Sequence, residues 1–353
     1  MSVLRIAAAL AVIMVSWPVT AQKFLWNVDF DFRFDNKEYA GMVNDASVTN
    51  FAARLTPQVG IGWGHGNAIM AGIDVMNNFG AGTRLMDEMV LYYRYRDDKF
   101  GAFLGRFSRR NLIGNYSYAF FSDYLSWYDN NIDGLAGQYV GWYGHVELVL
   151  DWNGMARGDM REKFSIFSAG NIDCSAFYAG YNARMYHFAG SETVRGVVDN
   201  ILLYPYVGID FTHYLPAFQE MSLQVGWLQA LQNDRRYIGE FVSPGGVQLE
   251  LRLERWGFGI YNTLYLGKNL MPYYSGTVEG QPSYGAELYF GEPFYKTDKG
   301  IYNRLEVYYR HRFKSNVALQ VSSVHHYDGD AWGWQQKFQV DIYLFEGVFK
   351  RGK

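Results

Sequence analysis

One short stretch near the C-terminal end carries the residue types of a covalent hydrolase. Residues 321–330 read VSSVHHYDGD, so Ser323 and His325 stand two positions apart and share one face of an extended strand. A serine nucleophile needs a base within hydrogen-bond reach and a group that orients this base. Leu319 and Val321 belong to the same face, as a site facing lipid would require. The stretch therefore carries a hypothesis of lipid hydrolysis, which loss of activity in Ser323→Ala would test.

Other motifs lack a partner that their chemistry needs. His325 and His326 are adjacent and point to opposite faces of a strand, which disfavours a shared metal ion. The glycine-rich stretch GIGWGHG at 60–66 leads to no helix, and a phosphate cradle needs one. Cys174 is the only cysteine, and a formal net charge of −3 gives no basic surface for nucleic acid. We expect no metal, no cofactor and no nucleic-acid partner.

Many charged residues stand at alternate positions of segments whose other positions are apolar. Rings of such charge around a pore determine which ions pass. Arginines gather in 84–97 and 301–313, and a transverse field across a pore would result if Asp123 and Asp129 of the connection 108–133 faced them. The plainer interpretation is that opposite charges neutralise one another around the wall. The candidates for lining a pore are Asp29, Asp31, Arg54, Glu88, Arg94, Arg96, Glu250, Arg252, Arg304, Glu306, Arg310, Arg312 and Asp341.

Alternation with a period of two predicts the elements that position these residues. Residues 24–35 read FLWNVDFDFRFD, in which every even position is apolar and five of the six odd positions are polar. This pattern is typical of a β-strand with one apolar face. It recurs in sixteen segments, approximately 24–35, 51–64, 67–77, 84–97, 99–107, 133–143, 145–153, 163–171, 173–188, 198–213, 221–231, 246–256, 258–267, 301–313, 317–326 and 334–346.

The connections between these segments indicate how the strands are arranged. Short connections alternate with long ones along the whole chain, as in a barrel with short periplasmic turns and long external loops. Nearly every apolar face is about 9–11 residues long, which suffices to span a membrane when the strand is tilted. We predict an all-β, transmembrane, up-and-down antiparallel β-barrel of about 16 strands, with 14–18 possible. A soluble exported sandwich or propeller is the alternative.

The first residues predict export. Arg5 precedes an apolar run over 6–17, and small residues follow up to Ala21. This order is typical of a signal peptide, and the run is shorter than a spanning helix needs. We expect a signal peptide over 1–21, cleaved on export to the cell outer membrane, and a barrel over 22–353.

At the level of pattern, the chain resembles Gram-negative outer-membrane porins from Gln22 onward. The resemblance implies a constriction loop after the fifth strand, and the connection 108–133 is long and rich in aromatic residues. The alternative is a loop that packs outside on its neighbours. The chain departs from the usual aromatic C-terminus of such barrels, because it ends in FKRGK. The constriction-loop candidates are Arg109, Arg110, Asp123, Tyr124, Trp127 and Asp129.

The function that we expect from the sequence is passive diffusion of small hydrophilic solutes, including sugars or ions, without any enzyme activity. A non-conducting barrel that binds or scaffolds a larger assembly is the first alternative, and the long external loop 268–300 suits that role. A lipid hydrolase built on Ser323 is the second alternative. The expected partners are outer-membrane lipid and small solutes, and the porin resemblance implies a homotrimer or a larger assembly.

Overall fold

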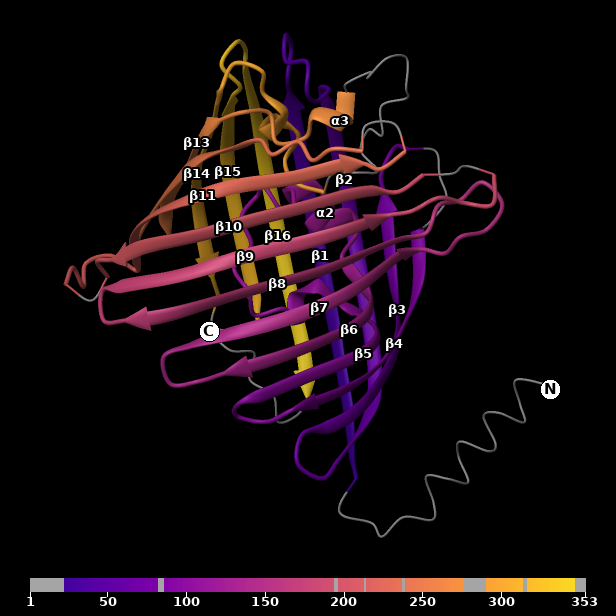
Figure 1. Ribbon diagram of the computed structural model, residues 1–353. Coiled ribbons are helices and arrows are strands. Elements are labelled where there is room, and N and C mark those ends of the chain that lie inside the picture. Colours follow the sequence, from indigo (N-terminus) through magenta and orange to yellow (C-terminus); the bar gives the residue numbers. More distant parts are fainter. Residues whose placement is uncertain are drawn as a thin grey trace.

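The computed structural model is a closed antiparallel β-barrel of sixteen strands (Figure 1). It describes residues 22–346 except 82–85, 194–195, 213, 237–238, 276–289 and 314–315. The expected signal peptide over 1–21 lies outside the described residues. Within the described part of the chain, no helix has both the length and the apolar character to cross a membrane. The predicted fold class is confirmed.

Each predicted strand is found, with ends that differ by several residues at some positions. The strands are β1 (Lys23–Glu38), β2 (Val48–Trp63), β3 (Asn67–Asn78), β4 (Met86–Arg96), β5 (Phe100–Ser108), β6 (Asn131–Val140), β7 (Gly144–Gly154), β8 (Lys163–Cys174), β9 (Phe177–Phe188), β10 (Val198–Asp210), β11 (Glu220–Asp234), β12 (Gly245–Arg255), β13 (Phe258–Gly267), β14 (Ile301–Arg312), β15 (Val317–Tyr327) and β16 (Trp332–Glu346).

The turn between β8 and β9 lies three to four residues beyond the predicted connection at 171–173. Ser175 occupies this turn with φ 59°, in the left-handed region that a tight reversal requires. The sequence offers no glycine or asparagine at this point, so alternation alone placed the reversal too early.

The first and last strands close the barrel. In Figure 1 the indigo β1 lies beside the yellow β16, and thirteen residue pairs join them from Trp26–Glu346 to Glu38–Trp334. Both ends of the described chain therefore lie at the edge that carries the short turns. The longer loops lie at the opposite edge, which we call the loop edge.

The outward face of the wall is apolar and exposed. Phe24, Leu55, Val59, Ile73 and Leu148 all point away from the barrel and are more than a third exposed. In a single soluble chain so much exposed apolar surface would be costly, and lipid is the solvent that removes the cost. The structure thus places on the outward side the apolar positions that the period-two pattern marks as one face.

Two short helical segments belong to the connection between β5 and β6. They are η1 (Arg109–Asn111) and α2 (Asp123–Tyr128), and the side chain of Ser122 caps α2 by accepting from Leu125 N. The connection between β13 and β14 holds α3 (Pro272–Ser275) and η3 (Pro293–Lys296).

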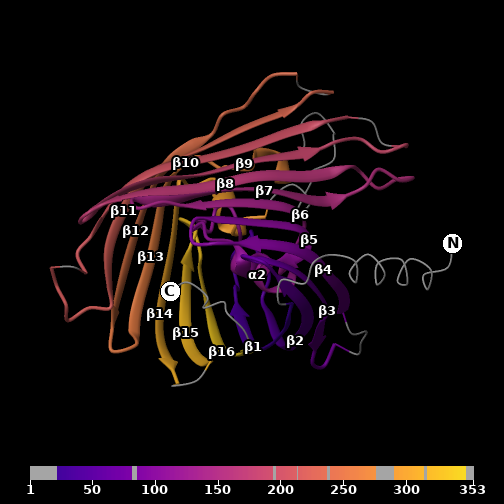
Figure 2. The ribbon, with the colours of Figure 1, turned by 90° about the horizontal axis from the view of Figure 1, so that it is seen from below.

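The connection between β5 and β6 lies inside the ring of strands (Figure 2). Its side chains and backbone contact β1, β2, β7, β9, β12, β14 and β16, which surround it from all sides. Phe120 from this segment and Phe294 and Tyr295 from η3 are fully buried in one apolar cluster with Tyr204 and Tyr265 of the wall. The inward aromatic residues thus pack against the two connections.

Candidate functional site

Ser323 and His325 of β15 face outward and are joined by a hydrogen bond. Ser323 Oγ lies 3.0 Å from His325 Nε2, and both side chains are half-buried. The ring of Trp332, at the start of β16, packs edge-on against His325 at 5.4 Å between ring centroids. The pleat of β15 places the serine and the histidine on one side of the strand, so a base stands within reach of a nucleophile.

Among the described residues, Ser323 and His325 form a dyad without a third catalytic partner. His325 Nδ1 is buried and has no hydrogen-bond partner among the described residues. The group that orients the base in a full catalytic triad is therefore missing. The two residues can still pass a proton from Ser323 Oγ to His325 Nε2 during attack on an ester.

A chain of polar side chains continues the site across the closing strands. Gln336 of β16 stands directly opposite Ser323 in the register. Its Oε1 accepts from Asn36 Nδ2 of β1 at 2.9 Å, and Asn36 Oδ1 accepts from Thr49 Oγ1 of β2 at 2.6 Å. Asn36 Nδ2 also donates to Glu38 Oε1 at 3.3 Å. Four adjacent strands thus carry one outward polar row, which we call the seam row: Thr49, Asn36, Gln336, Ser323 and His325.

On β1, β2 and β15 the seam row follows the run of apolar outward residues on the loop side, whereas on β16 the outward Trp334 and Trp332 lie beyond Gln336. On β15 the outward residue on the turn side of Ser323 is Val321, and on β1 the outward residue before Asn36 is Phe34. Gln336 is at the same level, because it pairs with both Asn36 and Ser323. In a membrane this level is the boundary between hydrocarbon and headgroups, where the acyl esters of lipids lie. The site can therefore reach an ester bond without leaving the barrel wall.

Asp123, a constriction-loop candidate, forms ion pairs with two strands of the barrel wall. Its carboxylate pairs with Arg33 of β1 and, at 3.2 Å, with Lys337 of β16. Burial alone would raise the pKa of Asp123, but Arg33 and Lys337 hold it well below its usual range. The carboxylate therefore stays charged and ties α2 to the seam from the inside.

The arginines of the loop are also paired. Arg110 Nη2 lies 2.8 Å from Asp31 Oδ1 on β1, and Arg109 Nη2 lies 2.8 Å from Asp151 Oδ2 and 3.2 Å from Asp129 Oδ2. Burial opposes the charge of Arg110, yet Asp31 raises its pKa above the ordinary value. Burial raises the pKa of Asp129, and Arg109 opposes this rise.

Two aromatic candidates of α2 have different surroundings. The ring of Trp127 is buried between the guanidinium groups of Arg33 and Arg54, at 5.6 and 5.7 Å. Tyr124 is half-exposed and stacks on Tyr128 at 4.3 Å. Trp127 therefore anchors the helix, and Tyr124 lines open space.

The predicted pore-lining residues all lie on the inward side, and most of them are paired. Arg54 pairs with Asp74 at 3.1 Å, and Arg304 pairs with Glu306 at 2.9 Å. The remaining contacts are Glu88 with Asn131 and Arg106, Glu250 with Arg252 and Tyr261, and Arg310 with Gln320 and Glu254. These pairs fit the plainer of the two interpretations from the sequence, in which opposite charges neutralise one another around the wall.

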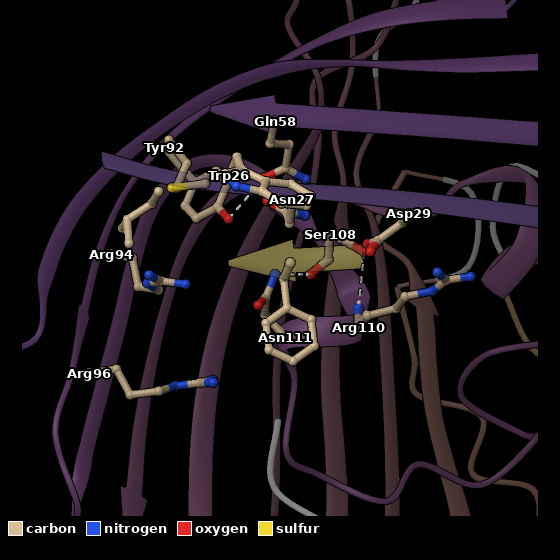
Figure 3. A pocket seen from close by; sticks show the side chains of 13 residues that line it. Trp26, Asn27, Asp29, Gln58, Tyr92, Arg94, Arg96, Ser108, Arg110 and Asn111 are labelled. Carbon is tan, nitrogen blue, oxygen red and sulfur yellow. Dashed lines mark hydrogen bonds between the residues drawn. The ribbon is translucent and has the colours of Figure 1, made fainter. Parts of the chain in front are cut away.

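Several cavities adjoin the loop, among them two that open toward the turn edge. The larger has a volume of about 650 Å³ and is lined by Arg312, Asp341 and Asp123 among others. The smaller, of about 90 Å³, brings together Asp29, Arg94, Arg96 and Arg110, as Figure 3 shows. The arginines of β4 thus share a pocket with the loop, while Arg312 and Asp341 line a separate space.

Sequence reasoning missed four residues of these networks. Asn36, Gln336 and Thr49 were not singled out. Asn36 and Thr49 are polar residues at the loop-edge end of an apolar outward face, and Gln336 is a polar residue between the outward Trp334 and Phe338. Lys337, at an inward position of β16, was not among the candidates either. The sequence does hold a signal for these residues. Where the first and last strands of a barrel pair, polar residues at the same level of the two strands must become neighbours.

A family model described as lipid A 3′-O-deacylase-type matches residues 20–347. This description names an enzyme family, so the prediction that the chain is not an enzyme is wrong. That prediction rested on the need for a complete triad, of which the stretch offered only a serine and a histidine. The sequence alone could not show that Ser323 and His325 form a hydrogen bond or that polar residues of β1 and β16 adjoin them. No curated protein matches the chain in a sequence search.

The fold resembles solved porins of Pseudomonas. OccK2 (OpdF) of Pseudomonas aeruginosa matches with a TM-score of 0.54 and 8% identity, over 92% of this chain and 98% of that one. OprB of Pseudomonas putida gives 0.52 and 8%, over 92% and 94%. OprD of Pseudomonas aeruginosa gives 0.51 and 10%, over 92% and 95%. At these identities the likeness concerns the barrel fold, and it agrees with the porin-type architecture predicted from the pattern.

Proposed function

The chain belongs to the lipid A 3′-O-deacylase-type family, and from this membership we propose that it is an outer-membrane esterase that releases an ester-linked acyl chain from lipid A. The observation that carries the proposal is the 3.0 Å contact between Ser323 Oγ and His325 Nε2 on the outward face. This pair stands at the height where the apolar face ends, so lipid esters are within its reach. Export through a signal peptide over 1–21 is part of the proposal.

The proposed reaction has two steps. Ser323 Oγ forms a bond to the ester carbonyl carbon while His325 Nε2 takes the serine proton, and the carbonyl electron pair moves onto oxygen. When the pair returns, the bond to the sugar oxygen breaks, and this oxygen takes the proton from His325. Water then attacks the acyl-serine, with His325 as base, and the fatty acid leaves as the proton returns to Ser323 Oγ.

The test is lipid A hydrolysis by purified protein in detergent micelles, followed by mass spectrometry of the released acyl chain. We expect Ser323→Ala to lower kcat by about 10³-fold or more, because the nucleophile is gone. Ser322→Ala is the matched control, since the adjacent serine points inward and its Oγ has no hydrogen-bond partner among the described residues. Unchanged turnover in folded Ser323→Ala protein would contradict the proposal.

A second candidate is the solute channel expected from the sequence. The cavity of about 650 Å³ supports it, because charged side chains and tyrosines line a space large enough for a small polar solute. The contacts of residues 109–130 with the surrounding wall narrow this path. A stable conductance in planar bilayers would support the channel, and silence in well-folded protein would contradict it. The porin resemblance implies a homotrimer. We keep this oligomer as a proposal, and it is compatible with both functions.

A further inference from the structure

We propose that Gln336 is a catalytic residue that stabilises the oxyanion formed when Ser323 attacks an ester, and that Asn36 and Thr49 position its amide. The inference rests on the proposed esterase function and adds three residues to it. It assigns a role to the seam row, which neither the family match nor the porin likeness explains.

The register places Gln336 where the oxyanion would form. Ser323 and Gln336 are directly opposite each other on β15 and β16, and both point outward. Side chains in such a pair start from Cβ atoms about 4.5–5.5 Å apart. An ester carbonyl bound at Ser323 Oγ therefore lies within reach of the longer glutamine side chain.

The hydrogen bonds of Gln336 leave its donor group available. Its Oε1 accepts from Asn36 Nδ2 at 2.9 Å, which identifies the edge of the amide that faces β1. Within the described residues, its Nε2 donates to no acceptor. An amide with its carbonyl edge fixed and its N–H edge unused, next to a nucleophile, is a preorganised donor for developing negative charge.

Asn36 is itself held in place. Its Oδ1 accepts from Thr49 Oγ1 at 2.6 Å, and its Nδ2 also lies 3.3 Å from Glu38 Oε1. Because Asn36 must present Nδ2 to both acceptors, its amide orientation is determined from three sides. That orientation in turn presents a donor to Gln336 Oε1 and reserves the Nε2 edge for a ligand.

The inference assigns Gln336 one task in the first step. As Ser323 Oγ bonds to the carbonyl carbon, the electron pair that moves onto the carbonyl oxygen creates a negative charge. Gln336 Nε2–H donates to this oxygen and releases it when the carbonyl re-forms and the sugar oxygen departs with the proton from His325. No proton leaves Gln336 and no bond to it is made, so the reaction balances as ester and water giving acid and alcohol.

The experiment compares Gln336→Leu and Gln336→Glu with wild type in the lipid A assay. Both variants remove the donor, and the second keeps the shape of the side chain. We expect kcat to fall by about 10²–10³-fold while KM stays within about threefold, because the lost interaction exists in the transition state. Gln229→Leu is the matched control, since Gln229 is also an outward glutamine but lies on β11, away from the seam.

A positioning role for Asn36 predicts a smaller effect of the same type. Asn36→Ala should lower kcat by about 3–10-fold with KM unchanged, because Gln336 keeps its donor but loses its fixed orientation. A purely structural role would instead change the folded fraction, which the electrophoretic mobility of unheated and heated samples reports. A loss of kcat that disappears when turnover is normalised to the folded fraction would overturn the positioning role.

The outcomes separate this inference from the function on which it rests. If Ser323→Ala is inactive and folded Gln336→Glu keeps kcat within threefold of wild type, the oxyanion role is wrong and the esterase stands. If folded Ser323→Ala keeps full activity, the esterase at this site is wrong and the role of Gln336 falls with it. A large kcat loss in both glutamine variants, with normal Gln229→Leu, supports the assignment.

Discussion

The outward seam row and the inward charge network lie on opposite sides of the strands β16 and β1, which both contribute residues to each. On the inward side, Arg33, Asp123, Lys337 and Glu306 form a continuous series of ion pairs. On the outward side, His325 Nδ1 has no hydrogen-bond partner among the described residues. Gln336 uses its Oε1 to accept from Asn36, and its Nε2 donates to no described residue.

The contrast separates polar groups that stabilise the fold from polar groups that are available to a substrate. Buried charges that satisfy one another resist change, since removing one partner strands the other. A polar row at a lipid boundary with unused donors and acceptors gains less stability from its own contacts and keeps groups for a substrate. The predictions below test that contrast from the largest expected effect on stability to the smallest.

Removing Asp123 should damage the inward network most. Asp123→Ala leaves Arg33 and Lys337 without their shared carboxylate, and we expect a loss of about 3 kcal/mol of unfolding free energy, at the low end for a broken buried pair because the Asp123 side chain is 26% exposed. Urea unfolding in phospholipid vesicles measures the loss. Asp98→Ala, in an exposed turn, serves as the control and should change nothing. Equal stability of both variants would mean that the pairs do not hold α2.

A charge on the lipid side of β1 should lower the unfolding free energy by a similar amount, for a different reason. Phe30 of β1 points outward opposite Ile342 of β16, midway along the apolar face. Phe30→Arg should lower the unfolding free energy by about 2–4 kcal/mol, as for arginine at a bilayer midplane, whereas Phe30→Leu should stay close to wild type. The same vesicle experiment applies, and wild-type stability in the arginine variant would contradict the lipid-facing assignment.

The charge of Lys296 should make stability depend weakly on pH. Burial in η3 lowers the pKa of Lys296 to about 8, below the ordinary 10.5. Between these values the unfolded chain holds the proton that the folded chain has lost, so stability rises with pH, by about 1 kcal/mol from pH 8 to 9. Lys296→Met should flatten that slope in unfolding curves recorded at several pH values. A slope unchanged by the substitution would assign the dependence to another group.

Alternation predicted the barrel because each strand obeys a local rule that the membrane enforces residue by residue. Phe30 and Asp31 take opposite faces whatever the rest of the chain does. The same rule placed Ser323 and His325 together and Arg54 on the inward side. Loop conformation obeys no such rule, so Asp123 was named as a candidate but its partners Arg33 and Lys337 were not.

The seam row shows a second limit of reading along the chain. Asn36 and Gln336 are 300 positions apart, and only the closing register brings them into contact. A pattern within one segment cannot identify such a pair. Comparing how far along the barrel axis each polar residue lies on neighbouring strands can identify it. The enzyme prediction failed at the same point, because it judged Ser323 by its own segment and not by the strands beside it.

The meeting of β1 with β16 also has a kinetic consequence. These strands are the first and last of the barrel in sequence order, and contacts between such distant parts of a chain form late in folding. Asn36 and Gln336 cannot meet, and Ser323 cannot acquire its opposite neighbour, until the ring is complete. In the proposed esterase, a chain whose barrel is still open would therefore be inactive toward lipid, and closure of the barrel would complete the site.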